Sequence, residues 1–139
     1  MSSRVFVDTN IWVYTVDASA PDKQARARIA VSPVPEKDIV VSAQVLGEFY
    51  VTVRRKLAES LPESDAIALV DRMRRLPVVP VDGDLVSTAI ANAGDWQLSY
   101  WDALIVAAAE SAGCDVLLSE DMGHDQIYGS VRVENPFLS

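Results

Sequence analysis

The 139-residue chain contains little of several residue types on which common protein sites depend. It has one cysteine, Cys114, so no disulfide can form within the chain, and we expect a reducing, cytoplasmic setting. It has one histidine, His124, which excludes a metal site built from three histidines. Its longest uninterrupted apolar run covers residues 103–109, far fewer than the ~20 residues of a membrane-spanning helix. These absences argue against a secreted disulfide scaffold, a histidine-rich metal site and an integral membrane protein.

Basic residues are scarce in the second half of the chain. Residues 76–139 carry one basic residue, Arg132, against ten acidic residues, and the whole chain has a net charge of −8. Non-specific nucleic-acid binding depends on Lys and Arg side chains that neutralise phosphates, so this balance argues against it. A divalent cation held by some of the acids would change the charge locally. The basic clusters at residues 26–28, 54–56 and 72–75 are typical of solvated helix faces.

The pattern of the chain indicates one α/β domain over residues 1–139. Half of the residues are apolar, and β-rich runs alternate with segments of helical periodicity. We expect three layers, α/β/α, with a mostly parallel sheet of about five strands. The expected strands cover residues 4–8, 38–42, 78–81, 115–119 and 131–134. The expected helices cover residues 21–31, 43–59, 62–75, 85–93 and 100–112, with a turn at Gly94 and an ambiguous pattern at 10–16. Pro80 lacks a backbone N–H group, so its strand is predicted at a sheet edge.

Four acidic residues fall where this predicted fold gathers functional side chains. Asp8 ends the first strand, and Asp121 follows the strand at 115–119. Glu48 and Asp102 lie in the first two turns of helices, and in a parallel sheet these positions share one edge with the strand ends. Carboxylates that lie close together raise one another's pKa, and a hard divalent cation is the usual compensation. The pattern therefore predicts a Mg²⁺ or Mn²⁺ site at this edge.

Each of these acids also has a structural interpretation. Ser99 and Asp102 have the spacing of a helix capping box. Glu48 lies at the margin of the apolar stripe of its helix, which is typical of a surface residue. Asp121 fits ordinary loop chemistry. Asp8 is harder to explain in this way, because a carboxylate directly after a Val-Phe-Val strand is expected to be partly buried and to need a partner.

Four motifs carry a resemblance to a known family. They are Val7-Asp8-Thr9-Asn10-Ile11, the helix that contains Glu48, Ser99-Tyr100-Trp101-Asp102-Ala103-Leu104-Ile105, and Leu117-Leu118-Ser119-Glu120-Asp121-Met122. With the closing segment 131–137, they resemble the PIN-domain family, and in particular its VapC-type toxins, in the family's own order. The resemblance covers nearly the whole chain. It implies a metal-dependent ribonuclease, the toxin of a type II toxin–antitoxin system, with a small antitoxin protein as partner and a homodimeric assembly.

The resemblance also implies roles for individual residues. Asp8, Glu48, Asp102 and Asp121 match the family's acidic quartet, and they are expected to be catalytic and to bind Mg²⁺ or Mn²⁺. Asp8 and Asp102 are the expected direct ligands, and the other two bind a second ion or act through water. Thr9, Asn10 and Ser119 are expected to orient the carboxylates or a water. A metal-activated water would then hydrolyse an RNA phosphodiester bond.

The loop after Asp121 departs from the VapC-type pattern. Here the chain reads Met122-Gly123-His124-Asp125-Gln126. The roles of Glu120, His124 and Asp125 are therefore left open, and His124 fits an ordinary loop histidine.

Two other functions share parts of this pattern. An Asp-Thr pair after a strand also suggests an aspartyl-phosphate phosphatase or a receiver domain, but these use a supporting lysine and the chain has none after Lys56. The main alternative is a non-catalytic binding module on the same fold, which holds a structural cation or none. Stabilisation by Mn²⁺ together with chelator-sensitive RNA cleavage would separate the enzyme from the module.

Partner surfaces follow from the mixture of residue types on the helices. The helices at 43–59 and 62–75 combine apolar and basic residues, and with the resemblance they are the expected docking surface for an antitoxin. Arg54, Arg55 or the cluster at 72–75 is expected to hold the RNA backbone.

The three tryptophans lie among apolar residues. We therefore interpret Trp12, Trp96 and Trp101 as core or interface residues rather than base-stacking platforms. Helical periodicity places Trp101 on the buried face of the helix at 100–112.

Overall fold

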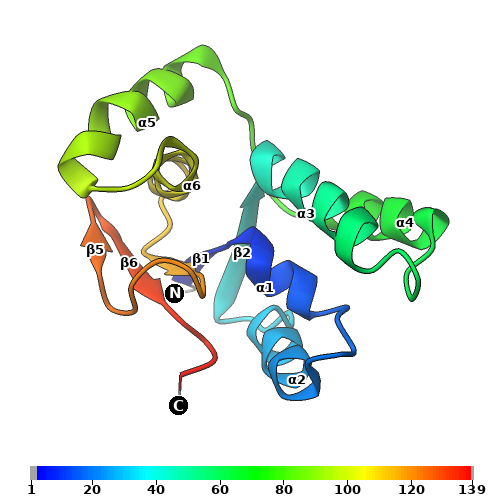
Figure 1. Cartoon of the computed structure of the whole chain (residues 1–139). Helices are drawn as coiled ribbons and strands as arrows, with labels where there is room; N and C mark the ends of the chain where they lie inside the picture. The colour runs from blue at the N-terminus through cyan, green and yellow to red at the C-terminus, as the bar shows by residue number, and fades with distance from the viewer. Residues whose placement is uncertain (1–2, 139) are drawn as a thin grey trace.

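The structure is a computed structural model that describes residues 3–138. Its centre is a sheet of six strands in the order β3-β2-β1-β4-β6-β5 (Figure 1). The strands are β1 (Ser3–Val7), β2 (Lys37–Ser42), β3 (Val78–Val79), β4 (Val116–Leu118), β5 (Ile127–Tyr128) and β6 (Val131–Glu134). All neighbouring strands pair in parallel except β5 and β6, which are antiparallel. The predicted α/β fold with a mostly parallel sheet is confirmed, with one strand more than expected.

Helices cover both faces of this sheet (Figure 1). They are α1 (Thr9–Tyr14), α2 (Pro21–Ala30), α3 (Ala43–Lys56), α4 (Glu63–Met73), α5 (Gly83–Trp96) and α6 (Tyr100–Ser111). Side chains alternate between the faces along a strand. Phe6 packs into a cluster with α3, α5 and α6, whereas Val5 and Val7 pack with Ile11 of α1 and Ala27 of α2. These two apolar clusters hold the three layers together.

The helices that carry predicted site residues are fixed by burial. On α3, Val45, Phe49 and Val53 are spaced four residues apart and are buried on one side of the helix. On α6, every residue from 103 to 109 is buried, because the sheet and α5 enclose the helix. Helix α3 follows β2 and helix α6 leads into the parallel strand β4, so the first turns of both helices lie at the carboxyl edge of the sheet.

Three elements differ from the prediction. The ambiguous segment forms most of α1, which begins directly after β1 because Asp8 caps it. Helix α5 continues through Gly94, where a turn was predicted, so that prediction is wrong. The packing of Ala89 and Ala93 against the core outweighs the ~1 kcal/mol cost of a helical glycine, and the helix ends at Trp96 where Gln97 turns left-handed at φ 55°. Strand β5 has two residues, too few to show an alternating pattern.

The edge prediction for the strand with Pro80 is confirmed, since β3 lies at the end of the sheet order. Among residues 3–138, no helix is both long and apolar enough to span a membrane.

Candidate active site

Asp8 joins β1 to α1 and is buried, with 6% of its surface exposed. Its Oδ1 accepts a hydrogen bond from the backbone N–H of Thr9 at 2.7 Å, and its Oδ2 accepts from the hydroxyl of Ser119 at 2.8 Å. Burial raises the pKa of Asp8 from 3.8 to about 6, the two hydrogen bonds oppose this rise, and the charges of Glu48 and Asp102 add to it. This carboxylate is therefore placed where a neighbouring positive charge would stabilise it.

Glu48 reaches the same region from α3. It is half-buried at the margin of the apolar side of that helix, as its position in the sequence predicted. Its Oε1 accepts a hydrogen bond from the hydroxyl of Thr9 at 3.0 Å. Thr9 thus contacts two acids, since its N–H binds Asp8 and its hydroxyl binds Glu48.

Asp102 lies in the first turn of α6. Its backbone N–H donates to the Ser99 hydroxyl oxygen at 3.1 Å, so Ser99 caps the helix as the sequence predicted. Burial raises the pKa of Asp102, and the negative charge of Asp121 raises it further. The capping position and a place among the acids are therefore compatible in one residue.

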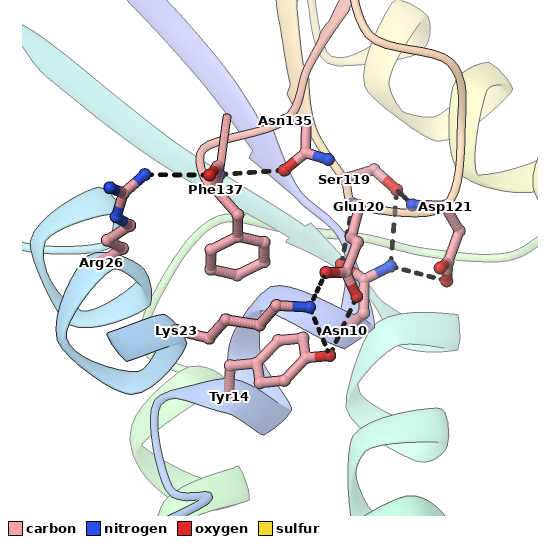
Figure 2. A network of polar contacts seen from close by, with 9 residues as sticks. All are labelled: Asn10, Tyr14, Lys23, Arg26, Ser119, Glu120, Asp121, Asn135 and Phe137. Carbon is pink, nitrogen blue, oxygen red and sulfur yellow. Dashed lines mark hydrogen bonds and ion pairs between the residues drawn. The ribbon is translucent and has the colours of Figure 1, made fainter. Parts of the chain in front are cut away.

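Asp121 lies on the loop after β4 and is exposed. Its Oδ2 accepts a hydrogen bond from Asn10 Nδ2 at 2.9 Å, and its backbone N–H donates to Ser119 Oγ at 3.2 Å. Asn10 also accepts from the backbone N–H of Glu120 at 3.2 Å (Figure 2). Asn10 and Ser119 therefore hold the loop that carries Asp121 against α1.

One cleft of about 670 Å³ brings the predicted residues together. Its lining includes Asp8, Glu48, Asp102 and Asp121, with Thr9 and Asn10 beside them, whereas Ser119 is fully buried behind Asp8. Within residues 3–138, none of these four carboxylates forms an ion pair with a Lys, Arg or His side chain. These four acids therefore bring negative charge to the cleft that no ion pair within residues 3–138 offsets.

The donor atoms of the cleft fit a hard divalent cation, because carboxylate, hydroxyl and amide oxygens are what Mg²⁺ prefers. The buried Asp8, with like charges beside it, supports this fit. As the side chains stand, no group of three or more His, Cys, Asp or Glu residues in the described part of the chain is placed to hold a metal ion. The carboxylates would therefore have to turn toward a shared ion.

A larger cavity of about 1030 Å³ lies away from the acids. Its walls are mainly apolar residues of β2, β3 and α4, among them Ile39, Val78 and Met73. None of the four predicted site acids lines it. The chemistry of the acidic cleft makes that cleft, rather than the larger cavity, the candidate active site.

A network of contacts ties the loop after β4 to the C-terminal segment (Figure 2). Lys23 forms an ion pair with Glu120, and the Tyr14 hydroxyl donates to Glu120 Oε1 at 2.9 Å. The Phe137 ring packs edge-on against Tyr14 at 5.1 Å between centroids, and Arg26 donates to the Phe137 carbonyl at 2.9 Å. We call Tyr14, Lys23, Glu120 and Phe137 the tail clamp. It fixes the residue directly before Asp121.

The structure shows which of the residues with open roles, Glu120, His124 and Asp125, line the cleft. Glu120 lines the cleft as well as joining the tail clamp. Asp125 lies outside the cleft lining and faces Arg132 at 3.3 Å. His124 also lies outside it, and its Nδ1 accepts from the Asn135 backbone N–H at 3.0 Å. Sequence spacing gave no signal for the tail clamp, since its members come from four distant positions.

The basic clusters separate in space. Arg55 and Lys56, in the last turn of α3, line the acidic cleft, whereas Arg72 lines the larger cavity. Arg54 and the other basic residues of the cluster at 72–75 do not line the cleft. Of the basic residues suggested by the sequence for RNA contact, Arg55 is therefore the one at the cleft.

Trp101 corrects a prediction. Trp12 and Trp96 pack against the apolar clusters as expected, but Trp101 is 62% exposed and lines the acidic cleft. Helical periodicity aligns Trp101 with the buried Leu104 and Ile105. Trp101 lies in the first turn of α6 and lines the cleft, so its indole stays accessible although its periodicity is that of a buried residue.

Comparison with protein families gives one match over most of the chain. A family model described as the PIN domain matches residues 5–130. No curated protein matches the chain.

Solved structures of similar fold extend this finding. VapC20 of Mycobacterium tuberculosis, described as a toxin that cleaves the sarcin-ricin loop, is 22% identical with a TM-score of 0.61, over 84% of this chain and 89% of that one. A chain from a toxin–antitoxin complex of Klebsiella pneumoniae is 16% identical with a TM-score of 0.67, over 95% and 97% of the two chains. A chain of VapBC2 from Rickettsia felis, bound to promoter DNA, is 17% identical with a TM-score of 0.65, over 95% and 98%. At these identities the likeness is one of fold.

Proposed function

Because the chain belongs to the PIN domain family, we propose that it is a metal-dependent endoribonuclease and the toxin of a VapC-type toxin–antitoxin pair. One observation carries this proposal. Carboxylates from four separate segments, Asp8, Glu48, Asp102 and Asp121, line one cleft in which they have no ion-pair partner among residues 3–138. Such an arrangement is costly unless a cation is bound, and hydrolysis of phosphodiesters is chemistry that a bound cation supports.

The residues of the cleft have distinct roles in this proposal. Asp8 and Asp102 would hold the ion, and Glu48 and Asp121 would bind a second ion or position water. Bound Mg²⁺ or Mn²⁺ supplies Lewis-acid chemistry, in which the scissile phosphate is polarised and the pKa of a water is lowered. The Ser119 hydroxyl holds Asp8, the Thr9 hydroxyl holds Glu48, and the Asn10 amide holds Asp121. These three residues orient the carboxylates and reduce their freedom to turn away from the cleft.

The similar structures support the proposed partners. Their descriptions name a ribosomal-loop-cleaving toxin and toxin–antitoxin complexes. We propose an RNA substrate, a small antitoxin protein that docks across α3 and α4, a homodimeric assembly and a cytoplasmic location for this chain as well.

Incubation with RNA tests the proposed activity. Purified wild-type protein, Asp8→Asn and Asp102→Asn are mixed with total RNA in Mg²⁺, in Mn²⁺ or in EDTA, and the product ends are mapped. We expect the wild type to cleave in either metal and not in EDTA, and both variants to lose cleavage while they remain folded. Asp95→Asn, on the exposed face of α5, is the matched control and should cleave like the wild type. Undiminished cleavage by Asp8→Asn or Asp102→Asn would remove that residue from the mechanism.

A non-catalytic binding module on the same fold, which holds a structural cation or none, is the second candidate. The observation in its favour is that no group of three or more His, Cys, Asp or Glu side chains within the described range is placed to hold a metal ion. If Mn²⁺ raises the unfolding temperature of the wild type but no RNA is cut, the module is the better description. If RNA is cut and EDTA stops the reaction, the metal-dependent ribonuclease is the better description.

A further inference from the structure

Trp101 is a large aromatic side chain left exposed beside the acidic cleft. Sixty-two per cent of its surface is accessible, and it lines the cleft together with Asp8 and with Asp102, its neighbour in sequence. Scattered exposed apolar residues need no explanation, but an indole at the mouth of a cleft offers a flat surface to whatever binds there.

The surroundings of Trp101 fix its position. Gln44 of α3 donates from Nε2 to the Trp101 carbonyl oxygen at 3.2 Å, which joins the first turn of α6 to α3 across the cleft. The indole packs edge-on against Tyr100, with 4.9 Å between ring centroids and an interplanar angle of 70°. The ring is therefore supported by a neighbour while most of its surface remains accessible.

Cations line the same cleft. Arg55 and Lys56 are exposed, and neither has an ion pair or a side-chain hydrogen bond within the described range. One hollow thus combines two free positive charges and an indole with the four predicted site carboxylates, beside which Asp17 and Glu120 also line it. Proteins that bind single-stranded nucleic acid combine a basic groove with aromatic side chains on which bases stack.

We propose that Trp101 stacks on an unpaired nucleobase next to the phosphodiester that the carboxylates attack. This inference rests on the proposed function and adds to it a residue that binds a base, which must be unpaired because a base within a duplex is not available to an indole. Arg55 and Lys56 then contact phosphates of the same strand. The interpretation of Trp101 as a core or interface residue is replaced by a role in substrate binding.

The stacking role is tested by measuring how tightly the protein binds two labelled nucleic-acid probes. The probes are a 12-nucleotide oligoadenylate and an abasic ribose-phosphate chain of the same length, titrated in EDTA so that neither is cut. We expect the wild type to prefer oligoadenylate, and Trp101→Ala to lose about 5- to 150-fold in affinity for it and little for the abasic chain. Trp101→Phe, which keeps an aromatic face, should retain most of the preference. Ile90→Ala, at an exposed apolar site on α5, is the control and should bind like the wild type.

The proposal is wrong if the wild type does not prefer oligoadenylate, or if Trp101→Ala keeps that preference. It is also wrong if Trp101→Ala changes the sedimentation of the protein from dimer to monomer, because the indole would then be an interface residue. Cleavage of total RNA by the wild type is measured in parallel. Loss of the base preference with normal cleavage removes only the stacking role, whereas absence of metal-dependent cleavage removes the proposed function.

Discussion

Asp8 illustrates how single residues in the cleft are balanced. Its carboxylate is buried beside Glu48 and Asp102, and hydrogen bonds from Ser119 and Thr9 compensate only in part, so its pKa remains raised to about 6. In the absence of a cation, the ionised Asp8 therefore opposes folding. A residue that costs stability in the free protein is what a cation-binding site requires, since the same charge attracts the ion.

The raised pKa predicts how stability depends on pH. In EDTA, the folded protein binds the Asp8 proton more tightly than the unfolded chain, whose carboxyl has the ordinary pKa of 3.8. Below pH 3.8, protonated Asp8 contributes its full ~3 kcal/mol to the free energy of unfolding. This contribution is lost as the pH rises past about 6. Urea unfolding measures this, and Asp8→Asn should gain ~2 kcal/mol relative to the wild type between about pH 4.5 and pH 8.

Asp95→Asn is the control for that measurement, because Asp95 is exposed and lies outside the cleft. A constant difference between wild type and Asp8→Asn over the whole pH range would contradict the prediction.

Ser119 is predicted to stabilise the ionised form of Asp8. Its buried hydroxyl donates to Asp8 and accepts from the Asp121 N–H, so Ser119→Ala leaves a buried carboxylate oxygen with one partner fewer. We expect a loss of ~1–3 kcal/mol of unfolding free energy near pH 8 and a smaller loss at acidic pH, where Asp8 is protonated. Urea unfolding at both pH values measures it. Ser111→Ala, which removes an exposed hydroxyl from the end of α6, should cost less than ~0.5 kcal/mol.

At the scale of elements, the site depends on how helices begin. Asp8 caps α1, Ser42 caps α3 and Ser99 caps α6, and each of these first turns carries a residue of the cleft or lies next to one. The partial positive charge of a helix N-terminus favours a nearby carboxylate. For Asp102 in the first turn of α6, this favours the charged form, whereas burial and Asp121 oppose it.

The tail clamp is predicted to position Asp121 through the loop after β4. Phe137→Ala removes the ring that packs against Tyr14 and leaves Lys23 and Glu120 less confined. We expect the unfolding free energy to fall by ~1–2 kcal/mol, less than for a fully buried phenylalanine, because Phe137 is half-buried. The rate of RNA cleavage should fall as well, since the loop before Asp121 becomes less ordered.

Chemical denaturation and single-turnover RNA cleavage measure the two effects of Phe137→Ala. Leu138→Ala is the control, since this neighbouring side chain is exposed and lies outside the tail clamp. An unchanged cleavage rate in a destabilised Phe137→Ala protein would show that the clamp supports the fold but not the site.

At the scale of the whole molecule, the fold redistributes the charge of the chain. Eleven of the twelve basic residues lie within residues 1–75 and the net charge is −8, yet α3 carries Arg55 and Lys56 to the rim of a cleft whose acids come from both ends of the chain. The overall charge repels RNA, so binding in the absence of a metal must depend on these local cations, and a bound metal would add to their effect.

The double variant Arg55→Gln/Lys56→Gln tests this dependence. Each lost phosphate contact should weaken RNA binding and reduce the slope of log affinity against log salt by about 0.7 for a single strand. Oligoadenylate binding at several salt concentrations measures the slope. The matched variant Arg74→Gln/Arg75→Gln, away from the cleft, should keep the wild-type slope. An equal reduction in both variants would indicate a general charge effect instead.

The sequence by itself determined the features that depend on local patterns. Alternating β-rich and helical segments predicted the parallel sheet, and the missing N–H of Pro80 predicted an edge strand. The positions of Asp8, Glu48, Asp102 and Asp121 relative to strand ends and helix starts predicted a common edge, and all four line one cleft. Periodicity and chain direction fix these relations before any packing is known.

Tertiary structure alone decided the features that depend on contacts between distant segments. It left Trp101 exposed although its periodicity is that of a buried residue, and it placed Arg55 and Lys56 of α3 at the cleft. It also assembled the tail clamp from positions 14, 23, 120 and 137. The physical reason is that periodicity states which side of an element a residue lies on, whereas burial and pairing depend on whether another element reaches that point.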